Sequence, residues 1–545
     1  MQDKRKPCGL TDRCHGASAR TRLGVAVMAL AVIPPAMAID LSPDNPDLAI
    51  RWDTTVKYSA AYRAQDVSAA LVGPANGDDG DRNFGKGLVS NRVDLFTEAD
   101  IVYNRQFGAR ISAAAWYDDV YNRTNNNDSP RTANSLSVPN NTFTGATRDL
   151  MGQKAELLDA FVFGGVELGD MNATGRLGKH SLLWGESLFF GSNGIAGGQA
   201  PVDIIKQLSV PGSQFKEIIR PVNQLSGQLQ VNPEMSLGAY YQFEWQPNRI
   251  PAAGSYLSAS DFLDVGGERF FLGPSSLVRG NDLVAKDSDQ YGMQMRFRPV
   301  GMDADFGLYA IQYNDKGFQT YIRPSTGSYA LAYHEGIRAY GASMSTSVGP
   351  ANVGVEVSVR DNTPLVNAGV VFAPGFNNSD NPAYPVGSSG HAQASTVLLL
   401  SPSALWQGGS LLAEVAWNRL LSISKNPQSL DPNATRDAWG FRVVLAPAYY
   451  QVMPGLDITV PIGLGYNPEG RSSVVNQFNG GVDKGGDFSI GVNGEYQKRF
   501  RFSVSYTAYI GSEGAYLVAP GNDRLSYQQK YADRNFLSFN LQTSF

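Results

Sequence analysis

Apolar and polar residues alternate along most of this chain in segments of roughly ten residues, a length typical of strands that cross a membrane. The C-terminal segment 537–545 is the clearest case: every odd-numbered position except Thr543 is apolar, and every even-numbered position is polar. Segments 236–245 and 352–359 repeat the pattern. A β-strand points successive side chains to opposite faces, so each segment has one apolar and one polar face. The sequence therefore predicts a protein built mainly of strands.

The connections between these segments are of two kinds that alternate. Tight turns rich in Gly, Pro and Asn, such as Asn232-Pro233-Glu234, separate long polar or Gly-rich stretches. The long stretches are expected at 64–89, 122–154, 185–221, 247–287, 314–336, 361–390, 421–436, 466–485 and 511–534. About 18 strands (16–18) with this asymmetry are typical of a transmembrane antiparallel β-barrel. We predict this all-β fold, with short helices in the 185–221 insertion.

The N-terminus resembles a secretory signal. A basic region up to Arg22 precedes the apolar stretch Leu23 to Ala36, and Ala36-Met37-Ala38 fits a signal-peptidase site that is cut after Ala38. The apolar stretch is shorter than the roughly 20 residues that a spanning helix needs. We therefore predict a signal peptide at 1–38 and a barrel at 39–545.

Composition and charge argue against several classes of function. Six basic and two acidic residues precede Ile39, so 39 Lys and Arg and 48 Asp and Glu remain, a formal charge of −9. This charge argues against a nucleic-acid-binding surface. Both cysteines lie within 1–38, and only His180, His334 and His391 follow, too scattered for a metal-binding motif. No nucleophile motif is found, so we do not expect an enzyme.

We expect no cofactor. The acidic loops 78–81 and 483–487 offer clustered oxygens that could hold calcium. Neither has the spacing of a known calcium loop, so the sequence favours solvated acidic loops.

Charged residues follow the polar faces of the predicted strands. A charge on the lipid face near the membrane centre costs roughly 2–4 kcal/mol, so these residues are expected to line a wet lumen. The lumen-wall candidates are Arg92, Asp94, Glu98, Arg110, Glu244, Arg296, Glu356 and Arg360. Their mixed signs predict little ion selectivity.

The 185–221 connection differs in character from the others. Pro201 to Leu208 and Ser213 to Ile219 have the caps and spacing of short amphipathic helices, with Ser213 as a plausible N-cap. We predict that this segment folds into the lumen and narrows the pore. The pore-constriction candidates are Trp184, Glu186, Asp203, Lys206, Lys216, Glu217 and Arg220. The alternative is a loop that lies flat over the mouth.

The same region carries a family resemblance. The run Gly178 to Gly191 with Trp184-Gly185-Glu186-Ser187, followed by Pro201-Val202-Asp203, Pro211-Gly212-Ser213 and a strand ending Tyr241-Gln242-Phe243-Glu244-Trp245, resembles the outer-membrane family catalogued as domain of unknown function thirteen-hundred-and-two. The resemblance covers essentially the whole chain after the signal. It implies a Gram-negative outer-membrane barrel that inserts through the barrel assembly machinery. It also implies a periplasmic lipoprotein-like partner, an inner-membrane permease of the resistance-nodulation-division type, and hydrophobic or lipid-like cargo.

Several long connections contain apolar side chains that could meet such cargo at the entrance. They are Leu182-Leu183-Trp184, Leu188-Phe189-Phe190, Phe262-Leu263, Phe270-Phe271-Leu272, Val370-Val371-Phe372 and Phe376. Apolar patches that face water often mark a ligand site, although these residues could equally pack together as a cap. With the resemblance, they favour an outer-membrane channel for hydrophobic or lipid-like compounds. A general porin for small polar solutes and a structural or adhesive barrel are the alternatives.

Overall fold

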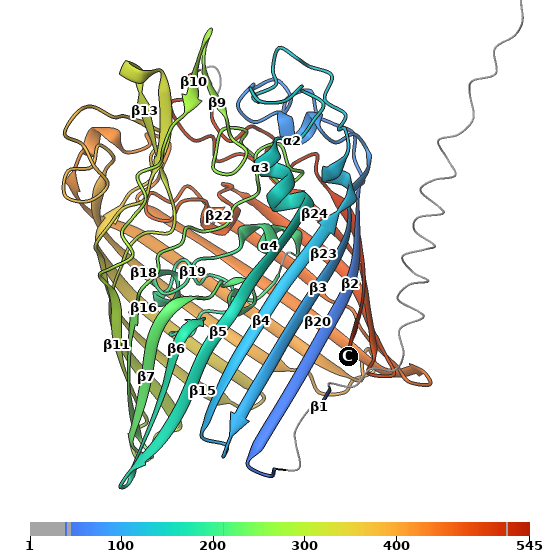
Figure 1. Cartoon of the computed structure of the whole chain (residues 1–545), viewed down its shortest axis with the longest axis vertical. Helices are drawn as coiled ribbons and strands as arrows, with labels where there is room; N and C mark the ends of the chain where they lie inside the picture. The colour runs from blue at the N-terminus through green and yellow to red at the C-terminus, as the bar shows by residue number, and fades with distance from the viewer. Residues whose placement is uncertain (1–38, 41–44, 211, 519–520) are drawn as a thin grey trace, which may run out of the picture.

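The computed structural model describes residues 39–40, 45–210, 212–518 and 521–545. The signal sequence and its cleavage after Ala38 lie outside the described residues. Long antiparallel strands form a barrel wall (Figure 1). They are β2 (Leu48–Arg63), β3 (Gly87–Tyr103), β4 (Phe107–Asp118), β5 (Gln153–Leu168), β6 (Met171–His180), β7 (Val222–Asn232), β8 (Met235–Gln242), β11 (Gln290–Phe297), β12 (Ala304–Tyr313), β15 (Ile337–Val348), β16 (Ala351–Pro364), β18 (Val386–Leu399), β19 (Gly408–Lys425), β20 (Asp437–Met453), β21 (Leu456–Thr459), β22 (Ile462–Glu469), β23 (Gly485–Tyr496), β24 (Phe500–Ile510) and β25 (Phe536–Ser544).

The barrel is closed by its first and last long strands. β2 pairs with β25 from Thr55 opposite Ser544 to Arg63 opposite Phe536. β21 and β22 form one wall strand interrupted near Pro461, since both pair with β20 and with β23. The short β1 (Ile39–Asp40) pairs with the start of β2. In the described chain the wall thus has 18 antiparallel strands, and the predicted fold and strand number are confirmed.

The outer face of the wall is apolar and the inner face is polar. Val93, Ile111 and Val162 point outward with about half of each side chain exposed, as do many other aliphatic residues of the wall. Glu356 and Glu414 point inward and are buried. This alternation matches the pleat of each strand and suits a barrel surrounded by lipid.

No helix within the described residues is long and apolar enough to cross a membrane.

The connections at the two ends of the barrel differ in length. One end, here called the turn end, has short connections such as 104–106 and 233–234. The opposite end, the loop end, has the long ones, and its loops form a second sheet at the top of Figure 1. That sheet has the order β17 (Val370–Val371), β13 (Gln319–Arg323), β14 (Ser328–Ala332), β10 (Ser275–Arg279) and β9 (Arg269–Leu272).

Apolar side chains of the loops pack together rather than facing water. Phe262 and Phe270 are 1% exposed, their ring centroids lie 4.3 Å apart, and both contact Tyr329 of β14. Trp184 and Phe189 are also buried, whereas Leu183 and Val371 remain exposed. The expectation of an apolar surface facing water at the entrance is therefore wrong for most of these residues. Burying them removes their apolar area from water and stabilises the loops as a cap.

Among the described residues, short helices and helical turns occur only in the connections. The helices are α2 (Asp79–Arg82), α3 (Gly145–Thr147), α4 (Ile204–Ser209) and α5 (Phe215–Ile218). Single helical turns occur at η1 (Asp119–Asn122), η2 (Arg148–Gly152), η3 (Ile195–Gly198), η4 (Pro324–Thr326), η5 (Pro427–Ser429) and η6 (Phe478–Gly480).

The two helices of the 185–221 connection are shorter than the sequence predicts. Asp203, not a residue near Pro201, is the N-cap of α4, and its side chain accepts the Lys206 N–H. Gln214, not Ser213, caps α5 and forms a capping box with Glu217. Val202, before the α4 cap, forms a β-bridge with Ile219 instead of entering the helix. Ser213, before the α5 cap, belongs to the preceding turn, where its N–H and its hydroxyl both donate to the Val210 carbonyl.

A buried ion-pair network joins the closing strands to the first long loop. The Asp81 carboxylate contacts the Arg63 guanidinium at 3.0 Å and the Arg534 guanidinium at 2.7 Å. Arg63 also pairs with Asp533 at 2.7 Å. All of these side chains are almost completely buried. Arg63 ends β2 and Arg534 precedes β25, so the network locks the seam at the loop end.

We expect Asp81→Asn to destabilise the barrel by about 3–5 kcal/mol, because it leaves two buried guanidinium groups with one carboxylate between them. Asp305→Asn is the matched control, since Asp305 pairs with Arg298 in an exposed position at the turn end, where loss of the pair should have little effect. The midpoint of unfolding, followed by the mobility difference of folded and heated protein in gels, measures both. Equal unfolding midpoints for Asp81→Asn and Asp305→Asn would contradict a role of the network in stability.

Candidate functional site

Residues 181–221, here called the lumen segment, leave the end of β6 and pass inside the barrel before β7 begins. Glu356 of β16 holds this segment to the wall. Its carboxylate accepts the Glu186 N–H at 2.9 Å and the Ile195 N–H at 2.6 Å. A carboxylate that accepts backbone N–H groups is stabilised in a buried position, and it fixes the position of the chain that donates to it. Figure 1 shows α4 of this segment surrounded by the wall strands.

Glu414 of β19 makes a second attachment of the same kind. Its carboxylate accepts the Ser187 hydroxyl at 3.1 Å and the Phe190 N–H at 2.9 Å, and it also accepts the Phe189 N–H. Arg360 of β16 donates to the Ser192 carbonyl at 2.8 Å. Residues 186–195 are therefore bonded to two wall strands by charged side chains.

Two glycines make this close approach possible. A Cβ atom at Gly185 would lie 2.2 Å from a Glu356 carboxylate oxygen, and one at Gly194 would lie 2.6 Å from the other oxygen. Gly185 also has a φ of +92°, a conformation that other residues rarely adopt. Glycine is needed at both positions for the backbone to reach the carboxylate.

The first two pore-constriction candidates contact the wall directly. Trp184 is 6% exposed, and its ring lies 5.0 Å from the Tyr240 ring of β8 and 6.3 Å from the Tyr309 ring of β12. Glu186 pairs with Arg296 of β11 at 3.4 Å. Trp184 therefore packs as an anchor against the wall.

The other candidates lie around α4 and α5. Asp203 pairs at 3.0 Å with Arg249, which also binds Glu156 of β5. Lys206 donates to the Glu217 carbonyl at 2.6 Å. Arg220 donates to the Pro247 carbonyl at 3.4 Å. The Glu217 carboxylate accepts the Gln214 N–H. Lys216 and Glu217 are exposed. Control of the pore by these residues stays a prediction.

The wall candidates fall into two groups. Arg296, Glu356 and Arg360 bind the lumen segment as described above. Arg92, Asp94, Glu98 and Arg110 lie on β3 and β4, where they form local pairs: Arg92 binds Asp94 at 2.6 Å, and Arg110 binds Asp100 at 2.6 Å. Glu244 lies two residues beyond the end of β8 and accepts the Asn223 N–H at 2.9 Å, so it belongs to the rim rather than the wall.

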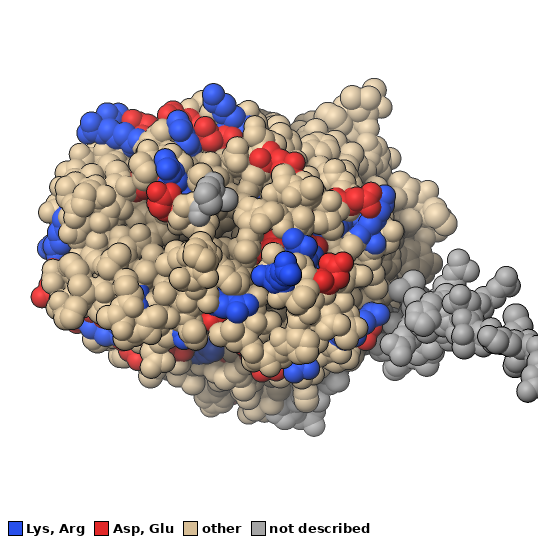
Figure 2. Space-filling model, turned by 90° about the horizontal axis from the view of Figure 1, so that it is seen from above, with Lys and Arg blue, Asp and Glu red and all other residues tan. Residues whose placement is uncertain are grey.

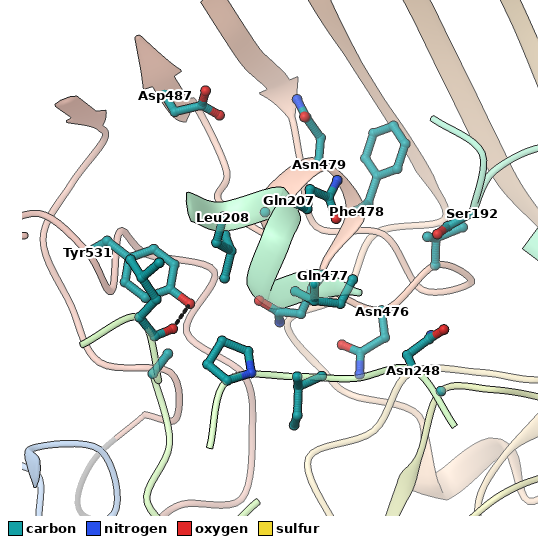
Figure 3. A pocket seen from close by; sticks show the side chains of 18 of the residues that line it. Ser192, Gln207, Leu208, Asn248, Asn476, Gln477, Phe478, Asn479, Asp487 and Tyr531 are labelled. Carbon is teal, nitrogen blue, oxygen red and sulfur yellow. Dashed lines mark hydrogen bonds between the residues drawn. The ribbon is translucent and has the colours of Figure 1, made fainter. Parts of the chain in front are cut away.

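A cavity of about 290 Å³ lies between the lumen segment and the loops of the loop end. Figure 3 shows Gln207 and Leu208 of α4, the loop residues Asn476 to Asn479, and Tyr531 around one space. Most of the other lining side chains are apolar, among them Phe189, Phe190, Ile204, Phe215, Leu257 and Phe318. Its size is near the lower end of the range for small-molecule sites.

None of the seven pore-constriction candidates lines this cavity. Three residues that the sequence analysis named as apolar side chains of the connections, Phe189, Phe190 and Leu263, do line the cavity. Other apolar residues of the lining, such as Phe215 and Phe318, were not selected. The spacing of Ile204 and Leu208, which share a helix face, was the available signal. The residues that surround that face are distant in sequence, so they could not be recognised from the sequence.

The acidic loop 78–81 is not solvated, contrary to the sequence analysis. Asp78 and Asp81 are at most 1% exposed, and Asp81 belongs to the seam network. Asp78, Asp79 and Asp261 bring oxygens within 4.8 Å of one another. Burial raises the pKa of all three carboxyl groups. The absence of a resident metal stays a prediction.

A sequence model of the family described as protein of unknown function (DUF1302) matches residues 19–545. The chain belongs to this family. The resemblance inferred from the 178–245 region is thereby confirmed. A search of curated proteins finds no match to this member of the DUF1302 family.

Solved barrels resemble this DUF1302 chain at low similarity. OccAB2 of Acinetobacter baumannii is 9% identical, with a TM-score of 0.42, over 91% of this chain and 98% of its own. OpdK of Pseudomonas aeruginosa, solved with vanillate, is 10% identical, with a TM-score of 0.40, over the same shares. OccK2 (OpdF) of P. aeruginosa, solved with glucuronate, is 9% identical, with a TM-score of 0.37, over 91% and 97%. These values carry no argument about the solutes of this chain.

We expect the double variant Glu356→Gln/Glu414→Gln to fold as a barrel but to release residues 186–195, because an amide has one acceptor oxygen and turns its NH2 group toward backbone donors. Each bond lost to a charged acceptor is worth about 1.5–3 kcal/mol. Single-channel conductance in a planar bilayer should rise. Glu495→Gln is the control, since Glu495 pairs with Arg501 near the turn end and touches no loop. Unchanged conductance in a folded double variant would refute the anchoring role.

Proposed function

We propose that this protein is an outer-membrane channel of a Gram-negative bacterium that passes small apolar or lipid-like compounds. The observation that carries the proposal is the apolar cavity between the lumen segment and the loop-end cap. Its lining residues come from the lumen segment and from the loops of the loop end. A mostly apolar site of this size favours a small hydrophobic molecule.

The wall supports placement in a membrane. Aliphatic side chains such as Leu95, Leu177 and Leu225 expose 43–51% of their surface on its outer face. A soluble protein rarely presents so large a continuous apolar surface, whereas lipid requires one. The long loops would then lie outside the cell and the short turns in the periplasm.

A general porin fits the loop end less well. Seen from above, loop side chains cover the barrel mouth, and basic and acidic residues are scattered across it (Figure 2). Below the cap, the lumen segment is bonded to the wall at Glu356 and Glu414. A porin for small polar solutes needs an open, charged passage, and this arrangement instead interposes an apolar site.

The partners that the family resemblance implies remain predictions. They are the barrel assembly machinery, a periplasmic lipoprotein-like protein and a permease of the resistance-nodulation-division type.

Leu208→Asp tests the proposal, because it places a charge on the apolar lining without touching the wall. Intact cells that produce the unaltered protein should accumulate the apolar dye N-phenyl-1-naphthylamine faster than cells without it, and Leu208→Asp should remove most of this gain. Leu136→Asp is the control, since Leu136 is an exposed loop residue that does not line the cavity.

Entry of arabinose into proteoliposomes provides the contrasting measurement. It should be slow for all three proteins. Fast arabinose entry together with dye uptake that does not respond to Leu208→Asp would favour the general porin, and a closed barrel in both assays would favour a structural or adhesive role.

A further inference from the structure

Lys530, in the connection between β24 and β25, is a buried cation that lines the loop-end cavity. Its side chain is 7% exposed. The ammonium donates to the Gly480 carbonyl at 2.7 Å and to the Gln477 side-chain oxygen. It also lies 5.4 Å from the centroid of the Tyr531 ring and 6.0 Å from that of Tyr516. An ammonium has three donors, so these two bonds leave one.

No carboxylate among the described residues pairs with Lys530. Lys316, the other buried lysine of the cavity, has no ion pair among these residues either, and its ammonium donates to the Gly198 carbonyl at 2.9 Å. Arg442 pairs with Asp487, and Lys316 is adjacent to Asp315, which opposes the lowering of its pKa by burial. Burial, together with a smaller contribution from the nearby Arg534 guanidinium, lowers the pKa of Lys530 to about 7. A buried charge without a counter-ion is unfavourable, and a bound anion would relieve this cost.

The remaining lining suits the apolar part of the same ligand. Leu208, Phe215, Leu257 and Phe318 contribute apolar walls, and the volume of about 290 Å³ admits one small molecule. Arg442 and Asp487 neutralise each other, and Asp315 lies next to Lys316 in the chain. Among the described residues of the lining, Lys530 thus contributes the one charge without an acidic neighbour, which favours a singly charged head group over a dianion.

We infer that Lys530 binds the carboxylate of a small amphipathic acid whose apolar part occupies the loop-end cavity. This inference rests on the proposed function and narrows its cargo to carboxylic acids with a hydrocarbon or aromatic body. The carboxylate supplies the missing counter-charge and accepts the third ammonium donor, and Gln477 holds the ammonium in place.

Calorimetric titration of the full-length barrel in lipid nanodiscs tests the inference, with empty nanodiscs as the blank. Octanoate should bind the unaltered protein more tightly than octan-1-ol, which has the same chain without the charge. Lys530→Met should weaken octanoate binding roughly tenfold or more, as expected for loss of a charged hydrogen bond, and should leave octan-1-ol binding unchanged. Lys530→Arg should retain the preference for octanoate.

Lys86→Met is the matched control, because Lys86 is an exposed lysine of the loop end that does not line the cavity. If both ligands bind equally well and Lys530→Met has no effect, the carboxylate inference is overturned while the apolar cavity stands. If neither ligand binds the unaltered protein, the proposed function fails with it. Mobility of unheated protein in gels checks that Lys530→Met folds, and Lys530→Arg decides the result if it does not.

Discussion

The closed ladder of backbone hydrogen bonds is the constraint on which the rest of this structure depends. In the hydrocarbon core of a membrane no water is present to satisfy an unpaired N–H or C=O group, so a sheet must have no free edge. Pairing of β2 with β25 removes the last edge. The seam is reinforced at the loop end, where Asp81 lies between Arg63 and Arg534. A barrel of this width has room for a chain segment in its interior.

The interior is filled by a chain segment that the wall holds through charge. Glu356 and Glu414 sit on the inner face of strands whose outer face is aliphatic, and both use their carboxylates to accept backbone N–H groups. Such a bond differs from an ion pair, since the donor belongs to the main chain and has no other partner available. Without the segment, burial of the Glu356 and Glu414 carboxylates would be unfavourable. Without these carboxylates, the segment would have unsatisfied backbone donors. Wall and insertion are therefore interdependent.

The loop-end cavity results from the meeting of several separate parts of the chain. The lumen segment forms its floor, the 247–263 and 475–480 loops form its sides, and the last connection brings Lys530 and Tyr531 to it. The apolar residues of the cap shield it from water, which strengthens any electrostatic contact made inside. A site with an apolar lining and one uncompensated ammonium combines hydrophobic attraction with a charge that can select among apolar molecules. Under the proposed function, its position between cap and lumen would link binding to passage.

The sequence by itself determined the strand pattern and, to within about two, the strand number, because a period of two places every second side chain on the same side of the wall. It also marked the 185–221 connection as different. It did not reveal that the Glu356 and Glu414 carboxylates bind the backbone of that connection or that Asp78 and Asp81 are buried. It also did not reveal that Lys530 lines the same cavity as α4. These facts depend on contacts between residues that lie far apart along the chain, such as Ser187 and Glu414. Only closure of the barrel brings such residues together. Local periodicity does not indicate which loop contacts which wall strand.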